Sequence, residues 1–255
     1  MERNNNFIKL EHIYFRYDDR WVIEDFHLSI REQEFVSIVG ASGCGKSTLL
    51  NIIAGLLPPS KGKVVLKELE ITHPGPDRTM VFQDDAVFPW YTVRQNVEYG
   101  LKIKRMKSGE MKEIVDHHLR LVGLKDAEDL FPRQLSGGMR KRVDVARAIS
   151  TNPEVLLMDE PFAALDVLTK ENLQTEFLNI WNNNPMTVIF VTHDLEEALY
   201  MSDRVVVMSR EPGEVKRVVE IPFNRPRNPE LKTSPAFQEM RRELGKVLHH
   251  NPEED

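Results

Sequence analysis

The stretch GASGCGKS at residues 40–47 limits the possible folds of this 255-residue chain more than any other part of the sequence. It follows the apolar run FVSIV (35–39) and precedes STLLNIIAGLL (47–57), so we expect a buried strand, a glycine-rich turn and a helix in succession. Glycines allow such a turn to curl until its N–H groups point inward at phosphate oxygens. Lys46 would bring a positive charge to the outer phosphates, and the Ser47 hydroxyl would be a ligand for Mg²⁺. The pattern predicts a nucleotide phosphate site.

A second chemical signal is VLLMDE at residues 155–160, where two carboxylates end a short apolar run. Asp159 is suited to hold Mg²⁺, either directly or through water. Glu160 would point to the other side of the strand and accept a proton from an attacking water molecule. Together with the phosphate-binding loop, these carboxylates predict hydrolysis of a nucleoside triphosphate.

Composition restricts the partners and the compartment. The sequence is 41% hydrophobic and 29% charged, which is ordinary for a globular protein. Its formal net charge is −6, whereas nucleic-acid-binding surfaces are usually basic, so nucleic acid is not expected as the main partner. The single cysteine, Cys44, excludes an internal disulfide and a multi-cysteine metal site. The chain starts without an apolar signal region and its apolar runs are too short to span a bilayer, so by itself it is expected to be soluble and cytosolic.

Apolar runs and helical spacing alternate along the chain in a way that indicates an α/β fold with an insertion. The stretch FHLSI (26–30) alternates as a half-buried strand does, and short buried strands are expected at 35–39, 79–83, 155–160 and 187–193.

These patterns suggest a division of the chain. Residues 1–87 and 149–222 are expected to form a nucleotide-binding core, and residues 88–148 a mostly helical subdomain. Residues 223–255 would be a C-terminal tail, in which 235–248 has the apolar stripe of an amphipathic helix that packs onto the core.

Four further features are not decided by spacing alone. LSGGMRKRVDVARAI (135–149) opens with Ser136 and two glycines at a helix start, which is another anion-binding arrangement. His193 ends an apolar strand, where a lone histidine is more often structural than catalytic. Gln83 is an ordinary polar strand end, and Tyr17 can stack on an adenine ring or simply pack near a turn.

The phosphate-binding loop is followed by FQ, LSGG, LLMDEP, ALD and VTHD. In this order and spacing, the motifs resemble the ATPase subunit of an ABC transporter over residues 7–222. The resemblance implies an α/β fold of the ABC-ATPase type, with a P-loop NTPase core, an inserted helical subdomain and an N-terminal antiparallel β part. It also implies that the ligands are ATP and Mg²⁺.

The resemblance assigns roles to individual residues, with Glu160 as the general base and His193 as the γ-phosphate switch. The residues it implies in catalysis are Lys46, Gln83, Glu160 and His193. Those it implies in holding Mg²⁺ are Ser47, Gln83 and Asp159. Those it implies in nucleotide binding are Tyr17, Gly40, Ala41, Ser42, Gly43, Cys44, Gly45, Lys46, Ser47, Thr48, Ser136, Gly137, Gly138, Met139 and Asp166.

In ABC ATPases two copies pack head to tail, and each ATP lies between the phosphate-binding loop of one copy and the signature of the other. Ser136–Met139 would then be half of a second site, which accounts for two phosphate-binding ends in one chain. ATP would hold the dimer closed until hydrolysis lets the halves separate. The second copy would be the same chain or a paralogue.

The stretch VFQDDAVFPWYTVRQNV (81–97) is similar to that of nitrate, sulfonate, taurine and bicarbonate importer ATPases. Importers for riboflavin and thiamine precursors share these features, so the solute stays open. Transmembrane permease subunits would dock near the residues after Gln83, where Phe88, Trp90 and Tyr91 can supply aromatic surface. Alternatively these rings pack the helical subdomain onto the core; we expect some to face inward and Trp90 to face outward.

In this interpretation the chain is peripheral, at the cytoplasmic side of the cell membrane, and a substrate-binding protein is an indirect partner. A soluble ABC ATPase that acts on ribosomes or DNA is the alternative class. It is disfavoured because such proteins carry two cassettes or a long coiled coil, and this chain has neither.

Overall fold

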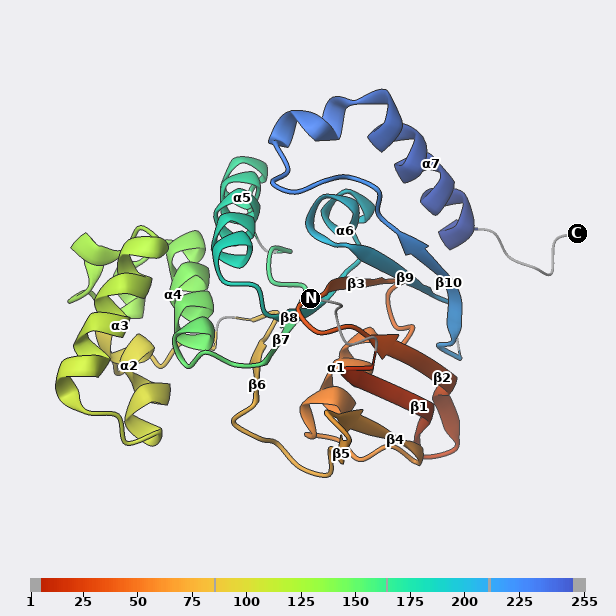
Figure 1. Ribbon diagram of the computed structural model, residues 1–255, viewed down its shortest axis with the longest axis horizontal. Helices are drawn as coiled ribbons and strands as arrows, with labels where there is room; N and C mark the ends of the chain where they lie inside the picture. Colours follow the sequence, from red (N-terminus) through yellow and green to blue (C-terminus); the bar gives the residue numbers. More distant parts are fainter. Residues whose placement is uncertain (1–5, 85, 164, 211, 250–255) are drawn as a thin grey trace, which may run out of the picture. The chain divides into compact units, whose positions relative to one another are not determined.

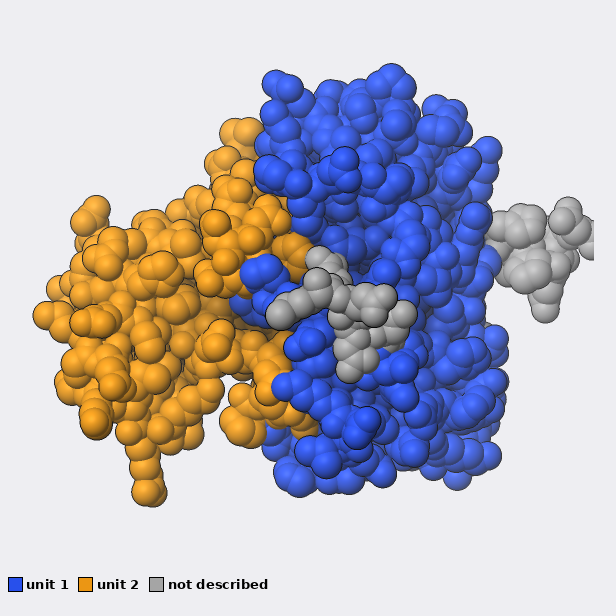
Figure 2. All heavy atoms as spheres, in the orientation of Figure 1, with its two compact units in different colours: residues 1–75, 185–255 blue, residues 76–184 orange. Residues whose placement is uncertain are grey.

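Two units make up the chain, which a computed structural model describes over residues 6–84, 86–163, 165–210 and 212–249. The first unit comprises residues 1–75 and 185–255, and the second comprises residues 76–184 (Figure 2). Within the described ranges, no helix has both the length and the apolar character needed to cross a bilayer.

The first unit contains an antiparallel sheet with the strand order β2-β1-β4-β5 (Figure 1). Its strands are β1 (Ile8–Tyr17), β2 (Arg20–Ile30), β4 (Lys61–Leu66) and β5 (Leu69–Glu70). In β2, Phe26, Leu28 and Ile30 are buried while His27 and Ser29 between them are exposed. The alternation predicted for this stretch and the antiparallel N-terminal part are therefore confirmed.

A second group of strands in this unit has the order β10-β9-β3-β8. The central strand β3 (Phe35–Val39) is parallel to β8 (Thr187–Thr192) and to β9 (Arg204–Met208), and β10 (Val215–Glu220) is antiparallel to β9. Every residue of β3 is buried, which explains its uninterrupted apolar composition. The strand coincides with the predicted range.

Helix α1 (Lys46–Ala54) follows β3 and ends three residues before the predicted limit of 57. Gly55 causes this end, because it adopts a φ of 78° and a Cβ there would lie 2.5 Å from the carbonyl carbon of His73.

The C-terminal part of this unit contains α6 (Leu195–Met201), the short 3-10 helix η3 (Pro229–Thr233) and α7 (Pro235–His249). Phe237 and Leu244 of α7 are buried, and the Phe237 ring stacks on Phe223 with centroids 5.7 Å apart. The predicted amphipathic helix therefore packs with its apolar stripe inward.

The second unit pairs β6 (Arg78–Val81) with β7 (Val155–Asp159) in parallel. Its helices, among the residues that are described, are α2 (Val93–Ile103), α3 (Ser108–Leu121), α4 (Gly137–Ser150) and α5 (Val167–Asn183), with 3-10 turns η1 (Lys125–Ala127) and η2 (Pro132–Gln134). Helix α2 packs against α4 and begins at a capping box formed by Thr92 and Gln95.

An ionic cluster connects the helices of the second unit. Arg94 on α2 and Lys125 on η1 both contact the carboxylates of Asp116 on α3 and Glu128. Hydrogen bonds from Lys125 and Arg94 lower the pKa of Asp116 to about 2, so this carboxylate stays ionised at neutral pH.

Candidate functional site

The glycine-rich loop between β3 and α1 has backbone angles and close contacts that residues with a side chain would tolerate only with strain. Gly43 and Gly45 have φ angles of 82° and 98°, in the left-handed region that favours glycine. A Cβ on Gly45 would lie 3.1 Å from a side-chain carbon of Val22. A Cβ on Gly40 would lie 2.6 Å from the sulfur of Cys44, whose pKa is raised by burial. The loop geometry therefore requires the glycines of the motif.

Lys46 holds its ammonium group against this loop. The residue is only 6% exposed, and its Nζ donates hydrogen bonds to the carbonyl oxygens of Gly40 at 2.8 Å and Ala41 at 2.9 Å. Helix α1 starts here without a side-chain cap, and its first turn contains the exposed Ser47 and the half-buried Thr48. A lysine beside the positive end of a helix dipole can bind an anion such as phosphate.

Tyr17 is an exposed aromatic residue at the end of β1. Its ring meets the buried Phe15 edge-on, with centroids 4.9 Å apart. A ring anchored in this way can stack on a flat heterocycle.

His193 follows β8 directly and is exposed. The turn after it is fixed because the Asp194 N–H donates to the Thr192 hydroxyl at 3.0 Å and the Asp194 carboxylate accepts from the Glu196 N–H at 2.9 Å. The Thr192 hydroxyl donates to the Glu197 carboxylate at 2.5 Å. These hydrogen bonds fix the backbone that follows β8, from which the exposed imidazole of His193 extends.

Asp159 and Glu160 differ in environment although they are adjacent. Asp159 is the last residue of β7 and is buried, whereas Glu160 is partly exposed and has a φ of 42°. Non-glycine residues with such φ angles are uncommon and cluster at functional sites. The buried carboxylate suits a metal ligand, and the more accessible one can receive a proton from water.

Gln83 lies two residues beyond β6 and is exposed. Hydrogen bonds connect the backbone around it to α4. The buried Lys141 on α4 donates to the carbonyl oxygens of Phe82 at 2.5 Å and Gln83 at 3.2 Å. Arg147, farther along α4, donates to the carbonyl oxygen of Ala86 at 2.7 Å. No sequence motif indicates either cation, because contacts to backbone carbonyls leave none. Their position on the helix that begins with LSGG is the one available signal.

The predicted signature begins α4. Ser136 is the N-cap, and its hydroxyl accepts a hydrogen bond from the Met139 N–H at 3.2 Å. Ser136 and Gly137 are exposed, and the first turn contains no acidic residue. A Cβ on Gly138 would lie 2.7 Å from the methyl carbon of Thr169 on α5. This helix start can therefore receive an anion on its exposed side.

Asp166 is the exposed N-cap of α5. Its carboxylate accepts a hydrogen bond from the Thr169 N–H at 3.1 Å, and hydrogen bonds with Thr169 lower the pKa of this carboxyl. Ala164, which opens the ALD motif, lies outside the described residues.

An aromatic patch formed by Phe88, Trp90, Tyr91 and Tyr99 lies after the Gln83 segment. Trp90 is 66% exposed and Tyr99 37%, whereas Phe88 and Tyr91 are partly buried, so Trp90 faces outward most, as expected. The Phe88 centroid lies 5.6 Å from that of Trp90 and 4.6 Å from that of Tyr99. The guanidinium of Arg147 lies 4.9 Å from the Phe88 ring centre.

The first unit thus carries Tyr17, the phosphate-binding loop and His193, and the second carries Gln83, the signature, both carboxylates and Asp166. Three of these residues have an oxygen atom that can bind a metal ion. They are Ser47 with a hydroxyl, Gln83 with an amide and Asp159 with a carboxylate. Oxygen ligands of this kind are those that Mg²⁺ prefers, so the donor set fits the predicted metal.

Known proteins resemble this chain over most of its length. A family model described as ABC transporter matches residues 23–163. The nitrate import ATP-binding protein NrtD of Synechococcus elongatus is 48% identical over 231 residues, which are 89% of this chain and 84% of that protein. The bicarbonate transport ATP-binding protein CmpD of the same organism is 47% identical over 224 residues, which are 86% of this chain and 81% of that protein.

A solved structure extends the comparison to the fold. The dimeric post-hydrolysis state of the ATP-binding cassette MJ0796, bound to ADP and Pi, matches with a TM-score of 0.75 and 32% identity over 85% of this chain and 100% of that chain. The predicted fold class is therefore confirmed. The chain belongs to the ABC transporter family, as an ATPase of that family.

Proposed function

We propose that this chain is the ATP-hydrolysing subunit of an ABC importer, which drives uptake of a small solute through separate permease subunits. The observation that carries this proposal is the occurrence of the phosphate-binding loop, the signature, the paired carboxylates and His193 in one ABC-family chain. Similarity to a nitrate and a bicarbonate import ATPase over most of both chains supports a small anion such as nitrate or bicarbonate. The resemblance of residues 81–97 to sulfonate and taurine importers extends the proposal to those solutes.

In this proposal the loop from Gly40 to Thr48 binds the phosphates of ATP with its backbone N–H groups. Lys46 already has its ammonium group beside the loop and would pair with the outer phosphates. Mg²⁺, held by Ser47, Gln83 and Asp159, would neutralise charge that develops on the phosphates.

The chemical step is assigned to one carboxylate and one imidazole. Glu160 would accept the proton of the attacking water, and His193 would contact the γ-phosphate from its exposed position after β8. Tyr17 would stack on the adenine ring.

Each ATP would be enclosed by two copies of the cassette, either identical chains or a chain and a paralogue. Ser136, Gly137, Gly138 and Met139 of one copy would meet the γ-phosphate bound to the loop of the other, because their helix start is exposed and not acidic. Asp166, also exposed, would lie at this interface. The dimer of the cassette MJ0796 supports such an association.

The permease subunits would receive the aromatic patch, since exposed aromatic residues are typical of protein interfaces. Lys141 and Arg147 would transmit nucleotide-dependent changes between that patch and the signature. From α4 they donate hydrogen bonds to the backbone carbonyls of Gln83 and Ala86, which precede the patch. The patch would belong to a helical subdomain over 88–148, attached to a nucleotide-binding core of 1–87 and 149–222. The chain would lie at the cytoplasmic face of the membrane and meet the substrate-binding protein only indirectly.

Affinity purification from gently solubilised native membranes tests this function. A polytopic permease and a substrate-binding protein should co-purify with the tagged chain, and a strain carrying Glu160→Gln should lose uptake of one labelled solute among nitrate, bicarbonate and taurine. A strain carrying Gly109→Ala, a position where a Cβ meets nothing within 4 Å, is the matched control. Recovery with ribosomes or DNA enzymes and no membrane protein would contradict the proposal, and uptake loss confined to riboflavin or a thiamine precursor would reassign the solute.

A further inference from the structure

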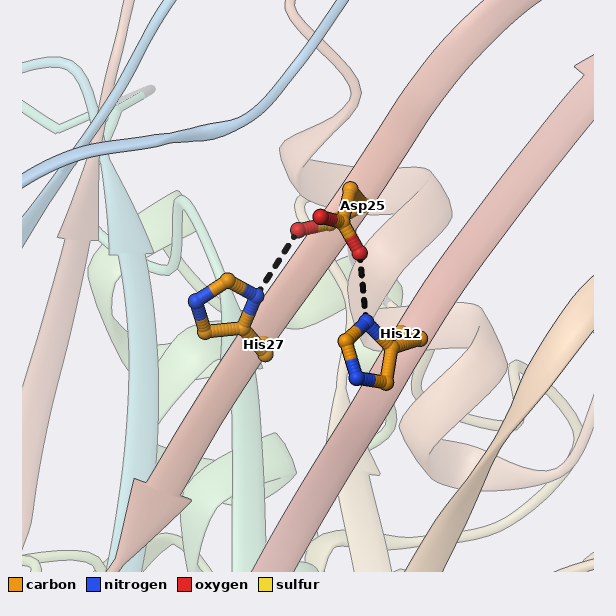
Figure 3. Close-up of side chains that lie close together, drawn as sticks. All are labelled: His12, Asp25 and His27. Carbon is orange, nitrogen blue, oxygen red and sulfur yellow. Dashed lines mark hydrogen bonds and ion pairs between the residues drawn. The ribbon is translucent and has the colours of Figure 1, made fainter.

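Two imidazoles and a carboxylate meet on the N-terminal antiparallel sheet, and none of them belongs to the motifs described above. His12 comes from β1, and Asp25 and His27 come from the neighbouring strand β2. Figure 3 shows the two rings on either side of Asp25. One ligating atom from each residue lies within 4.8 Å of the others.

Two irregularities in the pairing of β1 with β2 create this cluster. The register shifts between Leu10 and Ile13 and shifts again between Ile13 and Phe15. His12 lies in the first shift with a φ of 51°, and Asp25 lies opposite the second with a φ of 42°. Such bulges redirect side chains, and glycine adopts these φ angles with less strain than histidine or aspartate. Strained residues of this kind often mark a function.

The three side chains already interact, and they remain accessible. The His12 Nδ1 lies 2.6 Å from the Asp25 Oδ1, and the His27 Nδ1 lies 3.0 Å from the Asp25 backbone oxygen. The side chains of His12 and Asp25 are 74% and 47% exposed. A groove of about 600 Å³ borders both imidazoles, so a small ion can reach them from solvent.

This donor set has the chemistry of a transition-metal site. Two imidazole nitrogens and one carboxylate oxygen are ligands typical of Zn²⁺, with water in the fourth position, whereas Mg²⁺ is usually held by oxygen ligands. Ligands of one tetrahedral Zn²⁺ ion lie roughly 3.4 Å apart, given Zn–N distances of about 2.0–2.1 Å. Rotation of the exposed side chains about their own bonds can bring the three ligating atoms from their present distances to that spacing.

We propose that His12, Asp25 and His27 bind one Zn²⁺ ion and that this ion clamps β1 to β2 at the two bulges. Because the ion binds the folded sheet, it stabilises the protein against unfolding. The site is independent of ATP hydrolysis and of the Mg²⁺ ligands named above.

Calorimetric titration of ZnCl₂ into the full chain, freed of any purification tag and of nucleotide, tests this proposal. We expect one Zn²⁺ per chain and a higher melting temperature with Zn²⁺. His27→Gln should weaken binding by at least about tenfold, a loss found even for residues that only orient a metal ligand. His12→Asn should do the same while remaining compatible with the positive φ.

His73→Gln is the matched control, because it removes another exposed imidazole of the same unit. It should bind Zn²⁺ as the unchanged chain does, and circular dichroism would establish that all variants are folded. Zn X-ray absorption should show two imidazoles and no sulfur. The proposal is overturned if the unchanged chain binds no Zn²⁺, if His27→Gln binds it equally well, or if sulfur ligation points to Cys44.

Discussion

Two helices of this chain begin beside glycines at a predicted anion site, and their first turns are built differently. Helix α1 starts at Gly45, which has a φ of 98° and provides no side-chain cap, and the buried Lys46 holds its ammonium against the preceding loop. Helix α4 starts at Ser136, whose own hydroxyl caps the helix, and Ser136 and Gly137 are exposed.

The contrast explains what each helix start can do. A curled loop with a buried lysine can surround an anion from several sides, whereas an exposed helix start with a hydroxyl cap can complete a site only from one side. In the proposed dimer, the enclosing end of one copy would meet the completing end of the other. If the start of α1 encloses the anion and the start of α4 completes the site, substitutions at the two starts should have different effects.

The largest effect is expected for Glu160→Gln, which removes the proposed base and leaves both helix starts unchanged. Turnover should fall by about 10²–10⁴-fold, the range typical of general acid–base catalysis. ATP binding should persist, and gel filtration with ATP should show a trapped dimer. Phosphate release within threefold of the unchanged chain would contradict the role of Glu160.

A smaller loss of turnover is expected for Ser136→Arg, which blocks the start of α4 with a bulky side chain. Hydrolysis should fall on the order of 10²-fold, comparable to the loss of one donor that stabilises a transition state. Affinity for a fluorescent ATP analogue should change little, because the loop that contains Lys46 is intact. Equal loss of binding and turnover would mean that α4 supports the loop of its own chain instead.

Gly45→Ala tests the phosphate-binding loop through its effect on the free energy of unfolding. The positive φ and the 3.1 Å contact with Val22 should make this variant about 1–3 kcal/mol less stable to urea unfolding. Gly109→Ala in α3 is the matched control, since a Cβ there meets nothing within 4 Å, and it should be unchanged or up to about 1 kcal/mol more stable. Similar effects at both positions would show that the loop does not need glycine.

The smallest effect is expected for Asp166→Ala at the start of α5. Hydrogen bonds with Thr169 hold the folded-state pKa below the ordinary 3.8, so this carboxylate stabilises fully above that value and loses its contribution as pH falls through the lowered pKa. The variant should melt at a lower temperature at pH 7, and the difference from the unchanged chain should shrink below about pH 4. A difference that is constant from pH 7 to pH 3 would exclude a contribution from the ionised carboxylate.

The features that could be predicted from the sequence are those in which local pattern and function coincide. The apolar run 35–39 could only be buried, and a G-x-x-x-x-G-K-S turn after it has one known geometry, so β3 and its loop were predictable. The alternation at 26–30 likewise follows from one buried face.

Features that depend on contacts distant in sequence could not be predicted. Helix α1 ends early because the backbone at His73 approaches Gly55. Lys141 and Arg147 hold the Gln83 segment through backbone carbonyls, which carry no residue signature. The cluster of His12 with Asp25 depends on strand register, and no local spacing reveals a register shift.

Mixing two inactive variants tests the shared site most directly. Lys46→Ala disables the loop and Ser136→Arg disables the signature, so neither variant alone should hydrolyse ATP at a useful rate. If the sites are shared between copies, a mixed dimer contains one fully intact site, and random pairing should restore about one quarter of normal turnover. If each chain completes its own site, the mixture should be no more active than the average of the two variants.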